Sequence, residues 1–225
     1  MSRPIRTLIQ KALQQTCPIR AFFGFDEIDE IIRHKKEGIP FLYSDHAYFN
    51  RGYDNHNFRC VYNDIHLTRL LDVDKPRFGI PATAKWRQGE NVIFIPGASN
   101  PLRFLGDAGW NDKAIAVLSR SKRNIVVKAK KDGKLKEHLK NAWCLVTHSS
   151  VAGVEAAVHG IPVFGPQTSP SYPVSNGDIS DLENPVFPDR EPWLRSLTYA
   201  QYTLDEMKDG TAWSMVNEHQ HLRRA

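Results

Sequence analysis

A histidine and two serines, His148, Ser149 and Ser150, stand directly after the apolar run at residues 143–147. A segment rich in small residues follows them, and a second apolar run begins after Gly160. This order predicts a strand, a loop, a helix and a second parallel strand. We expect one of the two serines to cap the helix. Backbone N–H groups at a helix start, together with serine hydroxyls, suit the oxygens of a phosphate-bearing ligand.

Three further residues extend this candidate site. Glu155 lies on the predicted helix, where its carboxylate can accept hydrogen bonds from a ribose diol. Gly97 and Ser99 belong to a glycine turn after an earlier predicted strand. Ligands of open parallel sheets bind beyond the carboxyl ends of the strands, so this turn is expected beside His148. Helix-capping serines and an ordinary strand-to-helix turn are the purely structural alternatives.

Regular elements are predicted to position these residues. Strands at 91–95, 125–127 and 143–147 alternate with helices near 111–119 and 135–142. This alternation predicts an α/β fold with a parallel sheet covered on both faces, that is, a Rossmann-like domain. The proline- and glycine-containing stretch at 71–89 suits a connector between domains. We therefore predict three parts, at residues 1–80, 81–190 and 191–225, the last formed by helices that cross back.

Composition restricts the classes of partner. The formal net charge is +5, and basic residues cluster in Arg120–Arg123 and over residues 128–140, which suits a nucleic acid or an anionic substrate, or simply a solvated face. The three cysteines are far apart and lack metal-ligand spacing. We expect reduced thiols, no metal, no cofactor, no membrane association and a cytoplasmic protein.

The run from His148 through Ser149, Ser150, Glu155 and Gly160 to Val163 resembles the nucleotide-sugar signature of GT-B-fold glycosyltransferases. The similarity is closest to capsule-polysaccharide sugar transferases and phage-encoded DNA-modifying glycosyltransferases, and it covers residues 91–166. It implies two Rossmann-like lobes with parallel sheets, here with a reduced N-terminal lobe. It also implies donor contacts from His148, Ser149, Ser150, Glu155 and the Gly97 turn, with no metal. Relatives carry a basic residue near Lys128, which makes Lys128 a candidate counter-charge for the diphosphate.

A second group of polar residues follows the predicted strand at 41–43. It comprises Asp45 and His46, with Tyr48, Asn50 and Arg51 nearby. A sugar transfer needs a base that takes the proton of the acceptor hydroxyl, and Asp45 is the first candidate and His46 the second. A turn-capping aspartate beside a packed histidine is the structural alternative.

These observations predict a glycosyltransferase that moves a sugar from a nucleotide sugar, with a UDP-sugar as the candidate donor, to an acceptor hydroxyl. A hydroxymethylated pyrimidine in phage DNA is the preferred acceptor, and host cytoplasm is then the expected location. A capsule or surface-polysaccharide glycosyltransferase is one alternative. A non-catalytic nucleotide- or DNA-binding Rossmann module is the other.

Overall fold

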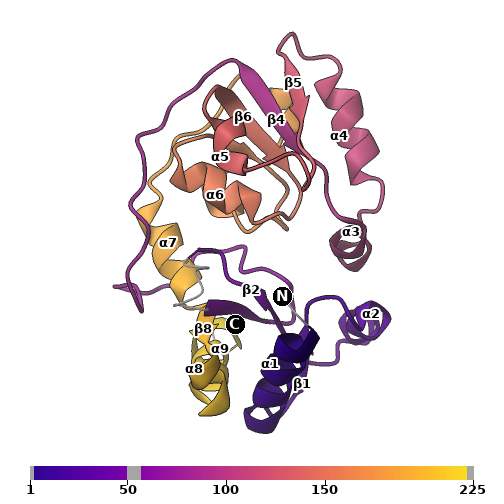
Figure 1. Cartoon of the computed structure of the whole chain (residues 1–225), viewed down its shortest axis with the longest axis vertical. Helices are drawn as coiled ribbons and strands as arrows, with labels where there is room; N and C mark the ends of the chain where they lie inside the picture. Colours follow the sequence, from indigo (N-terminus) through magenta and orange to yellow (C-terminus); the bar gives the residue numbers. More distant parts are fainter. Residues whose placement is uncertain (1–2, 50–56, 222–225) are drawn as a thin grey trace. The chain divides into compact units, whose positions relative to one another are not determined.

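The computed structural model describes residues 3–49 and 57–221, which form two compact units (Figure 1). The first unit takes the chain up to Leu67, Leu71–Ile80 and the residues from Leu194 onward. The second unit takes Thr68–Leu70 and Pro81–Trp193. Asn50 and Arg51 lie outside the described residues. The C-terminal helices thus belong largely to the first unit.

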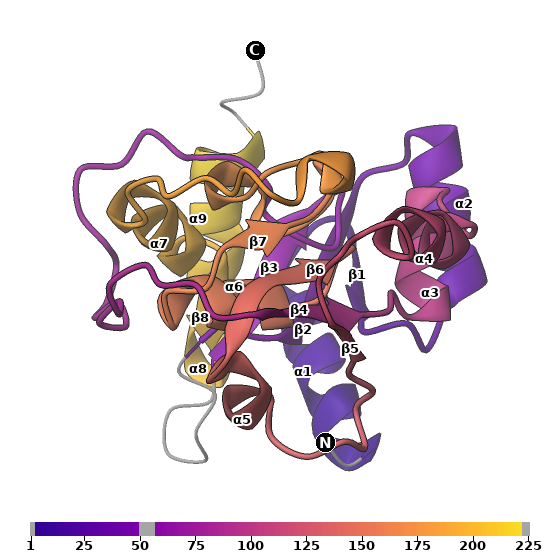
Figure 2. The ribbon, with the colours of Figure 1, turned by 90° about the horizontal axis from the view of Figure 1, so that it is seen from above.

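The second unit is built on a four-stranded parallel sheet with the order β5-β4-β6-β7, which can be followed in Figure 2. Its strands are β4 (Asn91–Ile95), β5 (Ile125–Val127), β6 (Ala142–Thr147) and β7 (Val163–Phe164). Apolar residues dominate these strands, as expected where helices cover both faces. The predicted α/β class and the parallel, Rossmann-like sheet of this region are confirmed.

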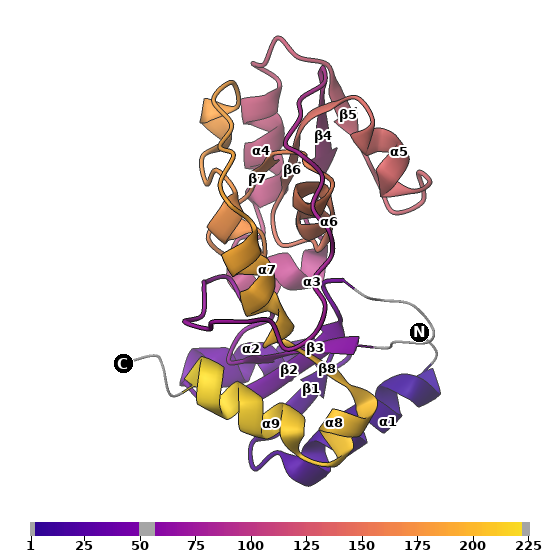
Figure 3. The ribbon, with the colours of Figure 1, turned by 90° about the vertical axis from the view of Figure 1, so that its left-hand side faces the viewer.

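Helices lie on both faces of this sheet. They are α3 (Ser99–Leu105), α4 (Trp110–Leu118), α5 (Leu135–Leu139) and α6 (Ala152–Val158), with the short turns η1 (Tyr172–Val174) and η2 (Ile179–Asp181) after β7. Figure 3 shows α4 on one side and α5 and α6 on the other. On the α4 side, one buried cluster joins Val92, Phe94, Cys144 and Val146 to Leu102, Trp110, Ala114 and Leu118. Burial of this cluster holds α3 and α4 against the sheet.

The first unit contains a mixed sheet, so the parallel sheet predicted for the N-terminal lobe is wrong. The strands β1 (Arg20–Phe23), β2 (Phe41–His46), β3 (Asn57–Tyr62) and β8 (Gln201–Thr203) follow the order β1-β2-β3-β8. Among the described strands of this sheet, β1 and β2 are parallel, whereas β3 runs antiparallel to β2 and β8. Residues 47–56 connect β2 to β3, and a parallel crossover needs a longer connection.

Helices also cover this sheet. They are α1 (Arg3–Thr16), α2 (Ile28–Glu37), α8 (Leu204–Lys208), α9 (Thr211–Val216) and the final turn η3 (Asn217–His221), while α7 (Glu191–Thr198) begins in the second unit and ends in the first. One cluster joins Ile9 and Leu13 of α1 to Met207, Val216 and the strand residues Phe23, Leu42 and Cys60. Within the described residues, no helix is long and apolar enough to cross a membrane.

Gly160 occupies a backbone position that tolerates no side chain. Its φ is +76°, and a Cβ atom there would lie 2.1 Å from the Lys85 carbonyl oxygen. The neighbouring segment runs alongside, because Ala84 donates to the Val158 carbonyl (2.9 Å) and Arg87 to that of Gly160 (2.8 Å). A methyl group on Gly160 would therefore push the backbone of residues 84–87 away from the backbone of Gly160.

We expect Gly160→Ala to lower the free energy of unfolding by about 3 kcal/mol, since left-handed strain and a backbone clash add. Gly133→Ala is the matched control, because Gly133 has a similar φ of +79° with nothing within 4 Å of its Cβ position. It should cost about 1 kcal/mol. Equal losses in urea unfolding would contradict the assigned clash.

Candidate functional site

The three segments that follow β4, β5 and β6 leave the sheet of the second unit at the same edge, the one formed by the carboxyl ends of these strands. In the β4–β6 pair, Ile95 is the partner of Thr147, so Pro96 and His148 directly follow paired residues. The Thr147 hydroxyl donates to the Ile95 carbonyl oxygen at 3.1 Å. The chain passes from β4 to β5 on one side, and β6 returns on the other side of β4. This is a topological switch point, the position where open α/β sheets bind ligands.

The Gly97 turn is fixed by a residue that the sequence did not indicate. Gly97 donates its N–H to Asn111 Oδ1 at 2.7 Å, and Asn111 Nδ2 donates to the Gly97 carbonyl oxygen at 3.0 Å. Both backbone groups of Gly97 therefore have partners within the protein. Ser99 is exposed at the start of α3, whose N-cap residue is Ala98. The Gly97 turn is thus held in a fixed conformation at this edge of the sheet, and the Ser99 hydroxyl beside it is accessible.

His148 is buried, with 1% of its surface exposed. Its Nε2 lies 3.4 Å from Asp107 Oδ2, and its ring packs edge-on against Trp110 with 5.1 Å between centroids. Burial lowers the pKa of His148, and the nearby Asp107 opposes this effect only partly. The imidazole is therefore neutral at pH 7. Its Nδ1 has no hydrogen-bond partner among the described residues. Sequence reasoning missed Asp107 and Trp110, because Asp107 lies in the connection between α3 and α4 and Trp110 is the first residue of α4.

The prediction that Ser149 or Ser150 is the N-cap of the following helix is wrong. The N-cap of α6 is Val151, and the helix begins at Ala152. A turn precedes the helix, in which Gly153 donates to the Ser150 carbonyl oxygen at 3.0 Å, and this turn delays the helical geometry. The Ser150 hydroxyl accepts a hydrogen bond from the Ala152 N–H (3.2 Å), whereas Ser149 is buried just before it.

Lys128 and Glu155 are the candidate charges at this edge. Lys128 directly follows β5 and is only 7% exposed. Its Nζ donates to the Ala129 carbonyl oxygen at 3.0 Å, and no ion pair joins it to a carboxylate of the described chain. Glu155 is half-buried on α6, and within the described ranges no hydrogen bond reaches its carboxylate. A buried amine without a carboxylate partner favours a bound anion at this edge.

In the first unit, Asp45 faces Arg59 across the β2–β3 pair. Arg59 Nη2 and the Tyr43 hydroxyl each donate to Asp45 Oδ2 at 3.0 Å, and the His46 N–H donates to Oδ1 at 2.7 Å. Burial raises the pKa of Asp45, but the Arg59 charge and these hydrogen bonds outweigh it and lower the pKa. Asp45 is thus ionised and a weak base. His46, at the end of β2, is exposed.

Arg59 explains why Asp45 is held so firmly. It is 5% exposed and also donates to the carbonyl oxygens of Ile65 and His46, both at 3.0 Å. The Tyr43 and Tyr48 rings lie 5.5 Å and 5.9 Å from its guanidinium carbon. A buried guanidinium requires a carboxylate partner, and Asp45 supplies it. An arginine within the otherwise apolar run of residues 58–62 was the sequence signal for this pair.

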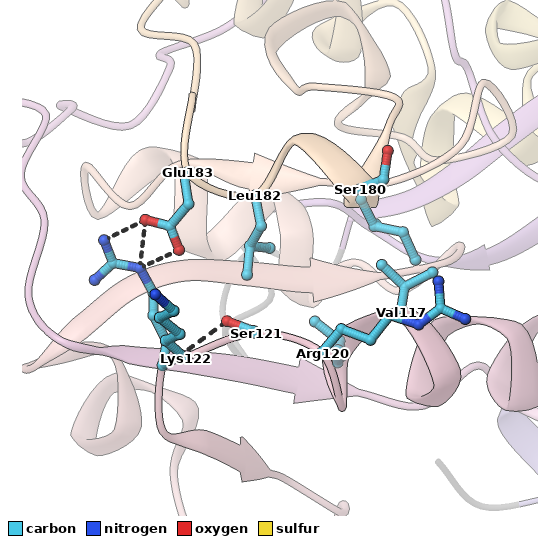
Figure 4. A pocket seen from close by; sticks show the side chains of 10 residues that line it. Val117, Arg120, Ser121, Lys122, Ser180, Leu182 and Glu183 are labelled. Carbon is cyan, nitrogen blue, oxygen red and sulfur yellow. Dashed lines mark hydrogen bonds and ion pairs between the residues drawn. The ribbon is translucent and has the colours of Figure 1, made fainter.

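A cavity of about 680 Å³ opens at the other end of β5 (Figure 4). Val117, Leu118, Ile179 and Leu182 supply its apolar lining, and Arg120, Lys122, Arg123 and Glu183 its charges. Arg123 makes a two-pronged ion pair with Glu183, with a shortest distance of 2.6 Å, and stacks on Trp143 at 3.3 Å. Nowhere in residues 3–49 and 57–221 do three or more His, Cys, Asp or Glu side chains form a potential metal site.

Removal of the Asp45 charge should destabilise the first unit. We expect Asp45→Asn to lower the free energy of unfolding by about 3 kcal/mol, because it leaves the buried Arg59 without a counter-charge. Asp26→Asn is the control, since Asp26 forms an exposed ion pair with Arg6 and should contribute less than about 1 kcal/mol. Urea unfolding measures both variants. Similar losses of unfolding free energy in the two variants would show that the Asp45–Arg59 pair stabilises the protein no more than an exposed ion pair does.

Protonation of His148 should couple stability to pH. Its pKa is lowered in the folded state, so below about pH 6.5 the unfolded chain binds more protons and stability falls as pH drops. We expect the urea midpoint to fall less between pH 7.5 and 5.5 in His148→Gln than in the wild type. A His148→Gln slope equal to the wild-type slope would refute this coupling.

Comparison with known proteins provides no relative from which a role can be transferred. No family model matches the chain, and no curated protein or solved structure matches it. The contacts at the carboxyl edge of the second unit's sheet, together with the sequence pattern, are therefore the basis of the functional proposal.

Proposed function

We propose that the second unit binds the diphosphate of a nucleotide sugar at the switch point between β4 and β6. The chain would then be a glycosyltransferase of the two-lobed GT-B type, with the second unit as the donor lobe. One observation carries the proposal. Lys128, a buried amine without a carboxylate partner, follows β5 at the same sheet edge where the Gly97 turn and His148 follow β4 and β6.

Each residue at this edge has a role consistent with its surroundings. Lys128 balances phosphate charge, and the Ser149 and Ser150 hydroxyls bind phosphate oxygens. Asp107 orients the His148 ring, whose Nδ1 is left for the ligand. Glu155 accepts hydrogen bonds from the ribose. The Gly97 turn acts by shape, because Asn111 already occupies its backbone groups.

The acceptor side of the reaction belongs to the first unit in this proposal. The acceptor hydroxyl is that of a hydroxymethylated pyrimidine in DNA, which would leave the base stack to react. Its proton passes to a base. Asp45 is ionised but is a weak base with three hydrogen-bond donors, so the exposed His46 is the better supported of the two candidates.

Donor binding tests the proposal directly. We expect calorimetric titration with a panel of nucleotide sugars to detect binding, and Lys128→Met to weaken it by about ten- to a hundredfold through the loss of a charge-assisted hydrogen bond. Lys130→Met is the matched control, because Lys130 is exposed two residues further along. It should bind like the wild type.

Turnover separates catalysis from binding alone. The wild type should hydrolyse or transfer its donor, and His46→Gln should lower kcat without changing donor affinity. Donor binding without any turnover would identify a non-catalytic nucleotide-binding module. Absence of binding to every nucleotide sugar, or equal affinities of Lys128→Met and Lys130→Met, would overturn the donor site.

A further inference from the structure

The positive charge of this chain is concentrated around one strand. Residues 120–140 contain nine lysines and arginines and two acidic residues, a net charge of +7. The rest of the chain has 21 basic and 23 acidic residues and is therefore slightly negative. Ordinary solvated surfaces intersperse both signs, because neighbouring like charges repel one another. In this chain the cations are instead segregated from the acidic residues.

The structure places several of these residues at the two ends of β5, the outermost described strand of its sheet. In the order β5-β4-β6-β7, β5 has a sheet neighbour only in β4 among the described strands, and Val127 of β5 is 57% exposed. Arg120 and Lys122 precede β5, whereas Lys130 and Lys131 follow it. All four are exposed, and no ion pair connects them to a carboxylate of the described chain. We call these four residues the β5 basic edge.

Nearby acidic residues do not cancel this charge. Glu183 forms an ion pair with Arg123, and Glu137 forms one with Lys140 at 2.5 Å. The carboxylate of Asp132 accepts the Ala129 N–H at 2.6 Å. Asp132 keeps its negative charge, but residues 120–140 still carry a net charge of +7, so the β5 basic edge presents a positive surface to a partner.

We propose that the β5 basic edge binds the phosphate backbone of nucleic acid. The three residues of β5 span roughly 10 Å, a length over which duplex DNA presents about six phosphates. Each DNA strand contributes about three of them, so cations at the two ends of β5 can contact different phosphates of one strand. This inference takes the nucleic-acid acceptor from the proposed function and assigns it a contact surface, on which Arg120 and Lys122 also line the cavity of Figure 4.

Neither protection of the sheet edge nor membrane binding accounts for the charge as well. Lysines can protect an edge strand from pairing with another chain, but β5 has only three residues and is already a poor template. An anionic membrane surface favours exposed large apolar side chains beside the cations. Across residues 120–140, Val127 is the one exposed large apolar side chain, because Leu139 is buried and Ile125, Val126 and Leu135 are partly buried, and a single valine offers little apolar surface to a membrane. A polyanion of high charge density in water is the better partner.

Two variants with the same change in charge test the proposal. The first is the triple variant Lys122→Gln, Lys130→Gln and Lys131→Gln. The control is Lys11→Gln, Lys36→Gln and Lys75→Gln, which removes three equally exposed lysines from the first unit. Fluorescence anisotropy of a labelled duplex of about 30 base pairs is measured with the full chain between about 50 and 200 mM NaCl.

We expect the first variant to bind DNA at least about tenfold more weakly, with a slope of log K against log salt that is shallower by about 2 to 3. The control should retain nearly the wild-type slope. Equal losses in both variants would show that only net charge matters, and the proposal would fail. Binding to vesicles rich in phosphatidylserine but not to DNA would also overturn it.

Donor titration distinguishes this inference from the proposed function. Both triple variants should bind the nucleotide sugar like the wild type, because neither includes Lys128. If no nucleotide sugar binds but DNA affinity still depends on the β5 basic edge, the donor site fails and the nucleic-acid surface stands. If donor binding holds but DNA affinity is unchanged in the first variant, only the surface assignment fails.

Discussion

The pairing of β4 with β6 is the constraint on which the second unit depends. Four consecutive residue pairs, from Val92 with Cys144 to Ile95 with Thr147, join strands about fifty residues apart in the sequence. β5 and β6 lie on opposite sides of β4. The connection from β4 to β5 and the connection from β5 to β6 therefore run in opposite directions across the sheet. Right-handed crossovers then place their helices on opposite faces. The Gly97 turn and the His148 segment are brought side by side as a consequence.

Sequence patterns predicted the second unit more closely than the first. Its strands are short apolar runs separated by helices, and the predicted strands at 91–95 and 125–127 coincide with β4 and β5. In the first unit, strand direction depends on a short connection and on a partner strand more than a hundred residues later. Local periodicity contains neither fact. The buried Arg59 also obscured β3, because a charged residue breaks the apolar pattern of a strand.

The candidate site illustrates the same division at the level of side chains. Motif spacing placed His148, Ser149 and the Gly97 turn at neighbouring strand ends, and parallel topology is enough for that. Their contacts come from elsewhere in the chain. Asn111 clamps the Gly97 turn, and Asp107 faces His148. Such partners depend on how α3 and α4 pack, which residue types alone do not specify.

The first unit is formed from two separate stretches of the chain. The late strand β8 completes a sheet that starts near the N-terminus, and the last helices pack into the core of the same unit. During synthesis, all strands of the second unit emerge before Gln201 does. At about 5–20 residues per second, the ribosome needs roughly 7–28 s to add the stretch between β3 and β8. For that time β3 has one open hydrogen-bonding edge and an incompletely covered apolar face. The nascent chain is thus open to misassembly at β3 while the strands of the second unit emerge, and chaperone contact is most valuable in that interval.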